Sequence, residues 1–280
     1  MFNFSKAEYN KVMIRNSFIL LEGIGEKRER RLWKEGVLTW EDFFCCKEIL
    51  DIDRERKKIY DDFLYEALNS LKVRDCYFFA KNLKKREHWR LFEEFISQTV
   101  CLDIETSGLT PEKGGYVTIV GLYSVNGYKA LVKGENLTEE ALQQAIDEHK
   151  YLITFYGSIF DIPFLKKEFP NLKIEHLPHF DLFFAGKRLG IQGGLKKLET
   201  MFLIEREEEL KGLNGYDAVK LWKAYLNGSI DSLERLISYN KADTENLFHI
   251  GKIFYDMLRT QVGIEEFINN GKQRSNQKVS

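Results

Sequence analysis

The hydrophobic and polar positions of residues 1–98 follow the spacing of helices. This stretch is rich in Lys, Glu, Arg and Leu, contains no proline and shows little of the alternation that marks strands. Trp89, Phe92 and Ile96 recur at helical spacing near its end. We therefore predict an all-helical domain over residues 1–80, followed by a connecting helix over 81–98.

The pattern changes at Val100, where apolar side chains begin to alternate with others. In an extended chain alternate side chains share a face, so Val100, Leu102 and Ile104 point one way, whereas Asp103 and Glu105 point the other. The segment therefore predicts a buried strand that carries two neighbouring carboxylates on one face.

Three further strands and a helix are predicted downstream. Apolar runs over 116–123 and 128–133 are separated by Asn126-Gly127, a pair typical of a tight hairpin turn, so the sheet begins as an antiparallel meander. Thr138 then caps a helix with an apolar face, and a fourth strand follows at 151–155. This order predicts an α/β fold, a mixed sheet flanked by helices, over residues 99–262. We expect the polar tail, 263–280, to be disordered.

Composition excludes several classes of protein. Lys and Arg total 42 and Asp and Glu 43, so no global field indicates a nucleic-acid or membrane partner, and binding of either kind requires local patches. Four cysteines without CxxC spacing do not match a zinc site or a secreted disulfide framework. The N-terminus lacks an apolar core and no segment has the length of a membrane span. We expect a soluble cytoplasmic protein.

Acidic residues recur where the predicted sheet would place ligands. Asp161 follows the fourth strand at a strand-to-helix junction. In the last helix Asn240 and Asp243 occupy positions of an apolar stripe, and Tyr239 lies one turn before Asp243. Because an unpaired carboxylate in a buried strand is costly, the pair on the first strand indicates a metal ion.

Each of these features also has an ordinary structural explanation. The acids of the first strand can be solvated at an edge, Asp161 can cap a helix beginning near Pro163, and the last helix can leave the core for one turn. Only the acids taken together favour a site.

A second feature precedes the sheet, at the glycines Gly23 and Gly25. There the sequence predicts an apolar helix end, a Gly23-Ile24-Gly25 hairpin, and a basic helix that Gly36 ends. The basic residues are Lys27, Arg28, Arg30, Arg31 and Lys34. Backbone N–H groups at the start of such a helix can bind phosphate. The segment resembles a helix-hairpin-helix module that binds nucleic acid, although a plain helical corner with a solvated face fits the residues equally well.

The acidic segments resemble the motifs of the DEDD exonucleases in order and in structural context. The motifs are Asp103-Ile104-Glu105-Thr106, Phe160-Asp161 and Tyr239-Asn240-Lys241-Ala242-Asp243, and the last has the form of the tyrosine subgroup. Supporting stretches lie at 180–182, 195–199 and 217–225. Over residues 99–258 the chain is similar to the YprB-like exonucleases, in which a helix-hairpin-helix segment accompanies the domain in some relatives.

The resemblance implies a ribonuclease H-like sheet and a metal-dependent 3′-5′ exonuclease acting on single-stranded ends of DNA or RNA. It implies two Mg²⁺ or Mn²⁺ ions, which suit hard oxygen ligands. Asp103 would bridge both ions, Glu105 and Asp161 would complete their coordination, and Asp243 would hold the ion that carries the attacking water. Tyr239 would orient that water.

Nucleic acid is the implied partner, held near Thr106 and Tyr156 and by the hairpin residues Gly23, Gly25, Lys27, Arg28 and Arg31. The chain departs from the family at Tyr156, where many relatives have Asn. A non-catalytic or weakly active nucleic-acid-binding protein with the same fold is therefore the alternative. A phosphoesterase acting on a small nucleotide is a third reading, against which the helical module argues.

Overall fold

The computed structural model describes residues 12–269, which divide into two compact units. The helical unit comprises residues up to Phe95 together with those from Tyr255 onward, and the sheet unit comprises Ile96–Phe254. The last long helix, α12 (Ile230–Val262), contributes to both. The predicted boundaries at residues 80, 98 and 262 remain a prediction.

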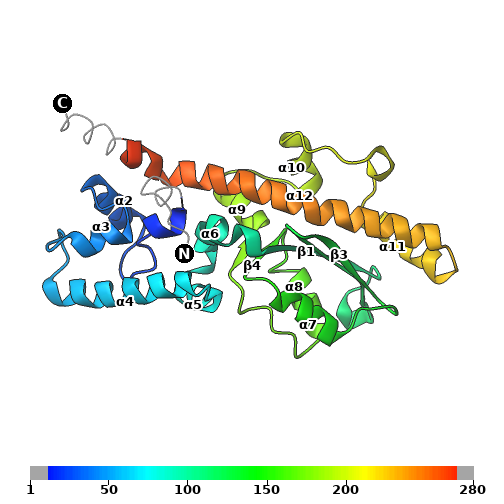
Figure 1. Cartoon of the computed structure of the whole chain (residues 1–280). Coiled ribbons are helices and arrows are strands. Elements are labelled where there is room, and N and C mark those ends of the chain that lie inside the picture. The colour runs from blue at the N-terminus through cyan, green and yellow to red at the C-terminus, as the bar shows by residue number, and fades with distance from the viewer. Residues whose placement is uncertain (1–11, 270–280) are drawn as a thin grey trace. The chain divides into compact units, whose positions relative to one another are not determined.

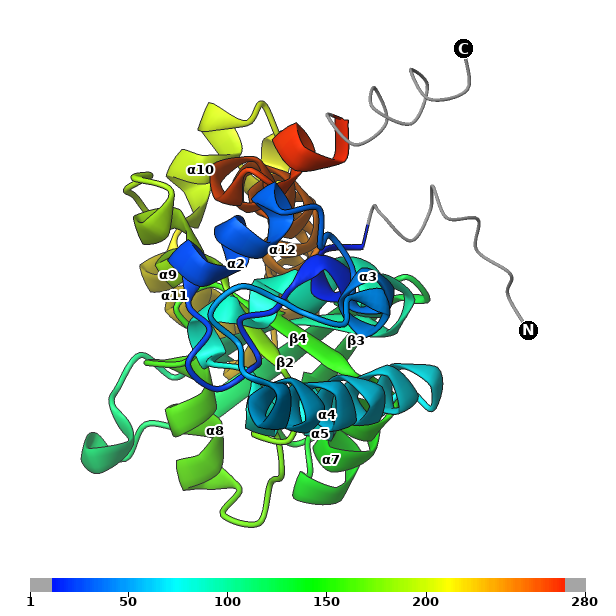
Figure 2. The same cartoon turned by 90° about the vertical axis from the view of Figure 1, so that its left-hand side faces the viewer.

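The helical unit consists of short helices and one longer helix, α4 (Arg54–Lys72), which lies in front in Figure 2. Its elements are η1 (Met13–Asn16), α2 (Glu26–Lys34), α3 (Trp40–Cys45), α4, α5 (Cys76–Asn82), η2 (Lys85–Leu91) and α6 (Phe92–Phe95). Asp53 caps α4 by accepting a hydrogen bond from the backbone of Arg56, and Thr39 caps α3 with a full capping box.

One prediction about helices in the first 98 residues is wrong and another is met only in part. The connecting segment 81–98 is helical except at residues 83–84, but it is divided into the end of α5, the 3-10 helix η2, the short α-helix α6 and the 3-10 helix η3 (Ile96–Gln98). The residues before the glycine hairpin, 17–22, form turns and irregular backbone rather than the end of an α-helix. Part of the predicted tail is also ordered, because residues 264–269 are helical and bury Ile264 and Ile268. Residues 270–280 lie outside the described part.

Side chains satisfy the backbone of residues 16–19 and so remove the need for a helix there. Glu29 Oε1 accepts hydrogen bonds from the backbone N–H groups of Phe18 and Ile19 at 2.8 and 3.2 Å. The indoles of Trp33 and Trp40 donate to the carbonyls of Asn16 and Ser17, both at 2.8 Å. Backbone groups bonded to side chains cannot also form the helical ladder.

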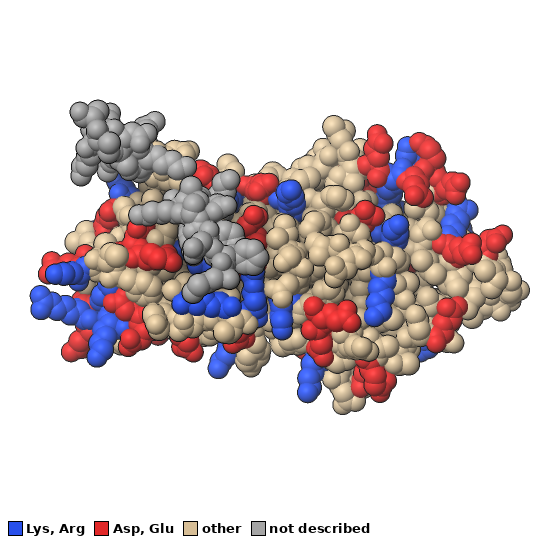
Figure 3. All heavy atoms as spheres, in the orientation of Figure 1, with Lys and Arg blue, Asp and Glu red and all other residues tan. Residues whose placement is uncertain are grey.

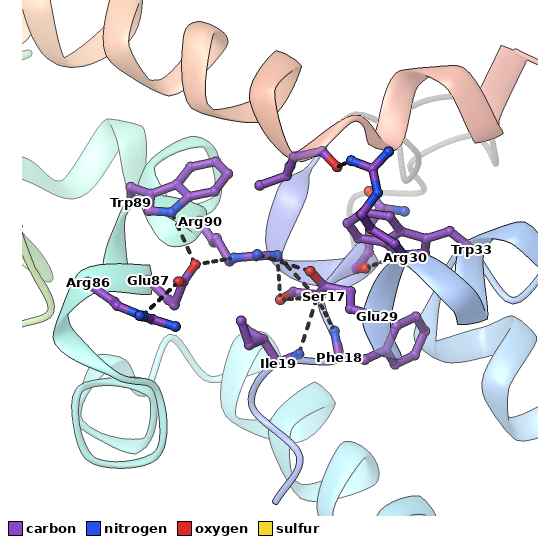
Figure 4. Close-up of polar contacts among 12 residues, drawn as sticks. Ser17, Phe18, Ile19, Glu29, Arg30, Trp33, Arg86, Glu87, Trp89 and Arg90 are labelled. Atoms are coloured by element: carbon purple, nitrogen blue, oxygen red, sulfur yellow. Dashed lines mark hydrogen bonds and ion pairs between the residues drawn. The ribbon is translucent and has the colours of Figure 1, made fainter. Parts of the chain in front are cut away.

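The same carboxylate belongs to a buried ionic network, drawn in Figure 4. The guanidinium of Arg90, which is fully buried, lies between Glu29 and Glu87, with nitrogen-to-oxygen distances of 3.0 and 2.8 Å. Arg90 also donates to the hydroxyl of Ser17 at 2.9 Å. The network therefore joins α2, the turn at Ser17 and the η2 segment within the helical unit.

The sheet unit contains five strands in the order β3-β2-β1-β4-β5. The strands are β1 (Thr99–Thr106), β2 (Val117–Ser124), β3 (Gly127–Val132), β4 (Tyr151–Thr154) and β5 (His179–Asp181). β1, β2 and β3 pair antiparallel, whereas β4 pairs parallel with β1 and β5 parallel with β4. The predicted antiparallel meander and mixed sheet are confirmed.

Helices cover both faces of this sheet, as Figure 1 shows. They are α7 (Glu139–Asp147), α8 (Asp161–Glu168), α9 (Leu182–Arg188), α10 (Leu195–Met201), α11 (Gly215–Leu226) and α12, with short turns at η4 (Pro111–Lys113) and η5 (Glu208–Leu210). Leu142 and Ile146 of α7 are fully buried, while Trp222 of α11 and Leu236 of α12 pack in one cluster with Ile119 of β2. Asp103 faces Gly121 and Glu105 faces Ile119 across the β1–β2 ladder, so both acids point toward the α11–α12 side.

Positive and negative side chains are interspersed on the face drawn in Figure 3, in agreement with the balanced composition. Among the described residues, no helix is long and apolar enough to cross a membrane.

Candidate active site

Three carboxylates from two distant segments converge on the α12 side of the sheet. Asp103 and Glu105 come from β1, and Asp243 comes from α12; one oxygen of each lies within 4.8 Å of the others. Glu105 and Asp243 are buried, at 8% and 7% exposure, and Asp103 is half-buried. We call these three residues the acid cluster.

Asn240 fixes the carboxylate of Asp103 from the neighbouring turn of α12. Its side-chain amide, which is fully buried, donates to Asp103 Oδ2 at 2.9 Å, and its Oδ1 accepts from the hydroxyl of Tyr128 at 2.9 Å. Gly121 of β2 leaves room for this contact, because a Cβ at that position would lie 1.7 Å from Asn240 Oδ1. Asn240, the polar residue within the apolar stripe of α12, therefore stays in the core and is hydrogen-bonded there.

Asp161 adjoins the acid cluster from the first residue of α8. Its Oδ1 accepts a hydrogen bond from the backbone N–H of Ile104, the residue between the two acids of β1, at 3.1 Å. The side chain is 4% exposed. The junction between β4 and α8 therefore places a fourth carboxylate, that of Asp161, against β1.

Burial and mutual repulsion disfavour the charged forms of these acids. Burial is the largest cause that raises the pKa of Asp103, followed by the charges of Asp161, Asp243 and Glu105. Burial, then Asp243 and Asp161, raise the pKa of Glu105 to about 8, and burial raises the pKa of Asp161 to about 7. Burial also raises the pKa of Asp243, although the charge of Arg206 opposes it. Such a group of acids is stabilised in its ionised form by a cation.

The cation that the structure places at Asp243 is the guanidinium of Arg206. It contacts the carboxylates of Asp243 and Glu199 together, and the side chain of Arg206 is only 7% exposed. Glu199 is held in turn by the amide of Asn246 at 2.9 Å. Sequence reasoning missed these roles: it singled out the stretch 195–199 only as a supporting similarity and assigned nothing to Arg206.

Tyr239 lies with its ring against two cations. Lys196 Nζ is 5.1 Å from the ring centroid and Arg206 Cζ is 5.6 Å from it. The ammonium of Lys196 is buried without a hydrogen-bond partner among the described residues. Burial, followed by the charges of Asp243, Glu105 and Asp103, raises the pKa of the Tyr239 hydroxyl, so this group stays protonated and can donate a hydrogen bond near the acids.

The family model of the RNase H superfamily matches residues 100–255, which include the strands, the acid cluster and Asp161. The chain belongs to the RNase H superfamily. We refer to the sheet unit below as the RNase H domain.

No curated protein matches the chain. One similar solved structure is the family B DNA polymerase from the hyperthermophilic archaeon Pyrobaculum calidifontis, at 13% identity and a TM-score of 0.43, over 53% of this chain and 24% of that one. Another is the Aedes aegypti Nibbler EXO domain, at 12% identity and a TM-score of 0.44, over 66% and 90%. The chain thus spans about a quarter of the polymerase, and both similarities are weak.

The donor set of the RNase H domain fits a divalent metal ion. Every convergent donor is a carboxylate oxygen, the type of ligand that Mg²⁺ and Mn²⁺ prefer, and burial together with mutual repulsion raises the pKa values of Asp103 and Glu105. Nucleases of this superfamily typically use divalent metals. Asp103, Glu105 and Asp243 are therefore the residues that could hold an ion.

The turn between β4 and α8 places Tyr156 in a strained backbone conformation. Its φ is +66°, a region in which Asn is favoured and bulky side chains are rare. The backbone at this position therefore suits Asn better than the Tyr that the chain carries. Tyr156 is 39% exposed, and its ring meets that of Phe183 edge-on at 4.7 Å.

Thr106 ends β1 beside the acids, and its hydroxyl accepts a hydrogen bond from the backbone of Gly108. The other predicted nucleic-acid contacts belong to the helical unit. Gly23 has φ of +78° and Gly25 precedes α2, so the glycine turn itself forms as predicted. Lys27 is exposed on the first turn of α2, whereas Arg28 donates to the carbonyl of Gly23 and Arg31 pairs with Asp51.

Proposed function

We propose that the RNase H domain is a metal-dependent 3′-5′ exonuclease that hydrolyses phosphodiester bonds of DNA or RNA and belongs to the tyrosine subgroup of the DEDD exonucleases. The observation that carries the proposal is the convergence of Asp103, Glu105 and Asp243, with Asp161 bound to the same strand. Acids separated along the chain meet here in the order that the exonuclease motifs require.

In this proposal the residues have distinct tasks. Asp103, Glu105, Asp161 and Asp243 hold two divalent ions, which when bound activate a water and neutralise charge on the phosphate. Asn240 keeps the carboxylate of Asp103 in place through its 2.9 Å hydrogen bond. The protonated hydroxyl of Tyr239 orients the attacking water, and its ring is held by Lys196 and Arg206.

The helical unit serves in this proposal as a module that binds backbone phosphates through the glycine turn and α2, although no α-helix precedes the turn within residues 12–22 as in a full helix-hairpin-helix. Its support is the Gly23 turn that leads into the basic helix α2, with Lys27 exposed near the helix start. A phosphate grip of this kind suits a polymeric substrate better than a small nucleotide, so single-stranded ends of nucleic acid are the proposed substrate.

The test is digestion of matched 5′- and 3′-labelled DNA and RNA strands, with and without Mn²⁺. The proposal predicts that digestion of either strand requires metal. A 3′-labelled strand should lose its label in the first cleavage, whereas a 5′-labelled strand should shorten progressively. Asp103→Asn is expected to abolish this activity, whereas Asp231→Asn, an exposed acid at the start of α12, leaves it unchanged.

Each other outcome has a clear meaning. Equal digestion by Asp103→Asn and the parent protein would remove the mechanism. Binding of the strands without metal-dependent turnover would favour the alternative, a nucleic-acid-binding protein that retains the fold. That alternative draws its support from Arg206, which already contacts the Asp243 carboxylate that an ion needs.

A further inference from the structure

A cavity of about 310 Å³ lies beside α9 of the RNase H domain. Its lining includes the rings of Phe155 and Phe183, the side chains of Lys187, Gln192 and Leu198, and the backbone of Gly193. Lys187 and Gln192 are exposed, so the cavity opens to solvent. Its volume is at the lower end of the range for sites that bind small molecules, about 300 Å³ and upward, and suits a group of nucleoside size.

Two walls of this α9 cavity continue directly into the acid site. Phe155 directly follows β4 and precedes Tyr156, which begins the turn leading to Asp161, and Tyr156 contacts Phe183. Leu198 on the opposite wall precedes Glu199, which binds Arg206 at Asp243. Lining residues of the cavity therefore adjoin, along the chain, both the turn that leads to Asp161 and the Glu199 that binds Arg206.

Asp181 holds the aromatic wall in place. Its carboxylate accepts hydrogen bonds from the backbone N–H groups of Tyr156, Ser158 and Phe183, at 2.9, 3.0 and 3.1 Å. Phe183 also meets Phe155 edge-on at 5.8 Å. The turn and the start of α9 thus form one unit, and a wall held in this way binds a ring with little ordering cost.

The cavity combines an aromatic surface with a positive charge. Lys187 Nζ lies 4.5 Å from the centroid of Phe183. Proteins that bind single-stranded nucleic acid stack bases on aromatic side chains and contact the adjoining phosphates with cations. A purely apolar ligand would form no favourable contact with the ammonium, and a small anion would form none with the rings.

We propose that the α9 cavity binds one base of the nucleic-acid strand against Phe155 and Phe183, with Lys187 on the adjoining phosphate. This inference rests on the proposed function for its substrate class and adds a subsite apart from the acid cluster. The exposed amide of Gln192 is placed to accept or donate a hydrogen bond at the base edge.

The probe is a set of single-stranded oligonucleotides in which 2-aminopurine, a base whose fluorescence falls on stacking, occupies successive positions. Binding is followed in EDTA so that no strand is cut. In the parent protein the fluorescence is expected to fall sharply at one position of the strand. Phe183→Leu should abolish that fall and weaken binding roughly 5- to 150-fold.

Two further variants separate the parts of the site. Lys187→Gln, a change at an exposed residue that leaves the core intact, should retain the fluorescence change but bind more weakly, with a smaller dependence on salt. Tyr216→Leu is the control, because Tyr216 is an aromatic residue of the same domain that is 69% exposed on α11 and does not line the cavity. It should behave as the parent protein.

The outcomes distinguish this subsite from the nuclease proposal, since digestion is measured separately with Mn²⁺. Parent-like affinity and fluorescence in both Phe183→Leu and Lys187→Gln overturn the subsite, even if digestion proceeds. If Phe183→Leu loses the fluorescence change but the parent protein digests no strand, the subsite is supported and the nuclease is rejected. A parent protein that neither binds nor digests rejects both. If Phe183→Leu does not fold, the salt dependence of Lys187→Gln decides.

Discussion

Arg206 binds Asp243 across 37 residues of chain and connects it to Glu199. The three side chains are between 5% and 10% exposed, so this contact is a nearly buried ion pair rather than a surface one. The positive charge of Arg206 opposes the rise in the pKa of Asp243 more strongly than the charge of Lys196, which acts in the same direction.

Arg206→Met is therefore expected to destabilise the RNase H domain. Removing one partner of a buried pair leaves uncompensated carboxylates and lowers the free energy of unfolding by about 3 kcal/mol. Mg²⁺ should restore more stability to this variant than to the parent, because a bound cation replaces the lost charge. Denaturant unfolding with and without Mg²⁺ measures both effects.

Arg235→Met is the control for that measurement. Arg235 is exposed, and within residues 12–269 it donates a hydrogen bond to the carbonyl of Glu209, so its loss should change stability by no more than about 0.5 kcal/mol. An equal response of Arg206→Met and the parent to Mg²⁺ would show that Arg206 and the metal act on Asp243 independently.

Gly121→Ala tests the hydrogen bond from Asn240 that positions Asp103. The new Cβ would lie 1.7 Å from Asn240 Oδ1 and 3.1 Å from Thr244 Cγ2, both on α12, so the amide must leave Asp103. Overpacking of this kind costs about 1–3 kcal/mol. Activity should fall further than stability suggests, on the order of 100-fold, because displacing a ligand by about 1 Å misaligns the site.

Digestion rates compared with unfolding curves separate these two effects. Gly215→Ala offers a matched change, since a Cβ there meets no atom within 4 Å. Full activity in a folded Gly121→Ala protein would show that the Asn240 contact with Asp103 is dispensable.

The sequence predicts the acids better than it predicts what surrounds them. Alternation along β1 places Asp103 and Glu105 on one face, and the stripe of α12 turns Asp243 inward, because periodicity alone decides which face a side chain takes. Arg206 lies in the coil between α10 and η5, which has no period, so its partner depends on how that segment folds back. The need for Gly121 similarly appears only with the strand register and the packing of α12.

The turn before the glycine hairpin escapes prediction for a different reason. The apolar residues around Leu20 and Leu21 are compatible with a helix, but the carboxylate of Glu29 binds the backbone at Phe18 and Ile19 instead. Tertiary contacts override local propensity here, and Glu29 carries no signal of burial in a segment that is otherwise strongly charged.

Arg90→Met is expected to destabilise the helical unit through this network. Arg90 is fully buried between Glu29 and Glu87, so its loss removes the cation that pairs with Glu29 and leaves Glu87 with the more exposed Arg86 at 3.3 Å, at a cost of about 3–5 kcal/mol (Figure 4). Arg54→Met is the comparison, because Arg54 is 91% exposed and its nearest carboxylate oxygen, on Glu48, is 3.8 Å away. Denaturant unfolding that shifts equally in both variants would contradict a stabilising role for the network.

The basic helix α2 gives a prediction that separates two residues of like charge. Lys27 is exposed near the helix start, whereas Arg31 already contacts Asp51 at 2.5 Å and Glu35 at 3.2 Å. A cation that is already paired with two carboxylates contributes little to the binding of a phosphate. Lys27→Ala should therefore reduce the slope of log affinity against log salt by about 0.7 for single strands, and Arg31→Ala by much less.

Fluorescence anisotropy of a labelled oligonucleotide, titrated between low and physiological salt, provides the measurement. Lys72→Ala serves as the comparison, because Lys72 is an exposed lysine of the same unit at the end of α4, 12 residues beyond Tyr60, whose hydroxyl contacts Glu22 beside the glycine turn. If α2 holds a phosphate, only Lys27→Ala changes the slope strongly, since counterion release occurs where the cation and the phosphate meet. Identical slopes for all three variants and the parent would instead make α2 a solvated helix, and the grip on nucleic acid would have to come from the RNase H domain alone.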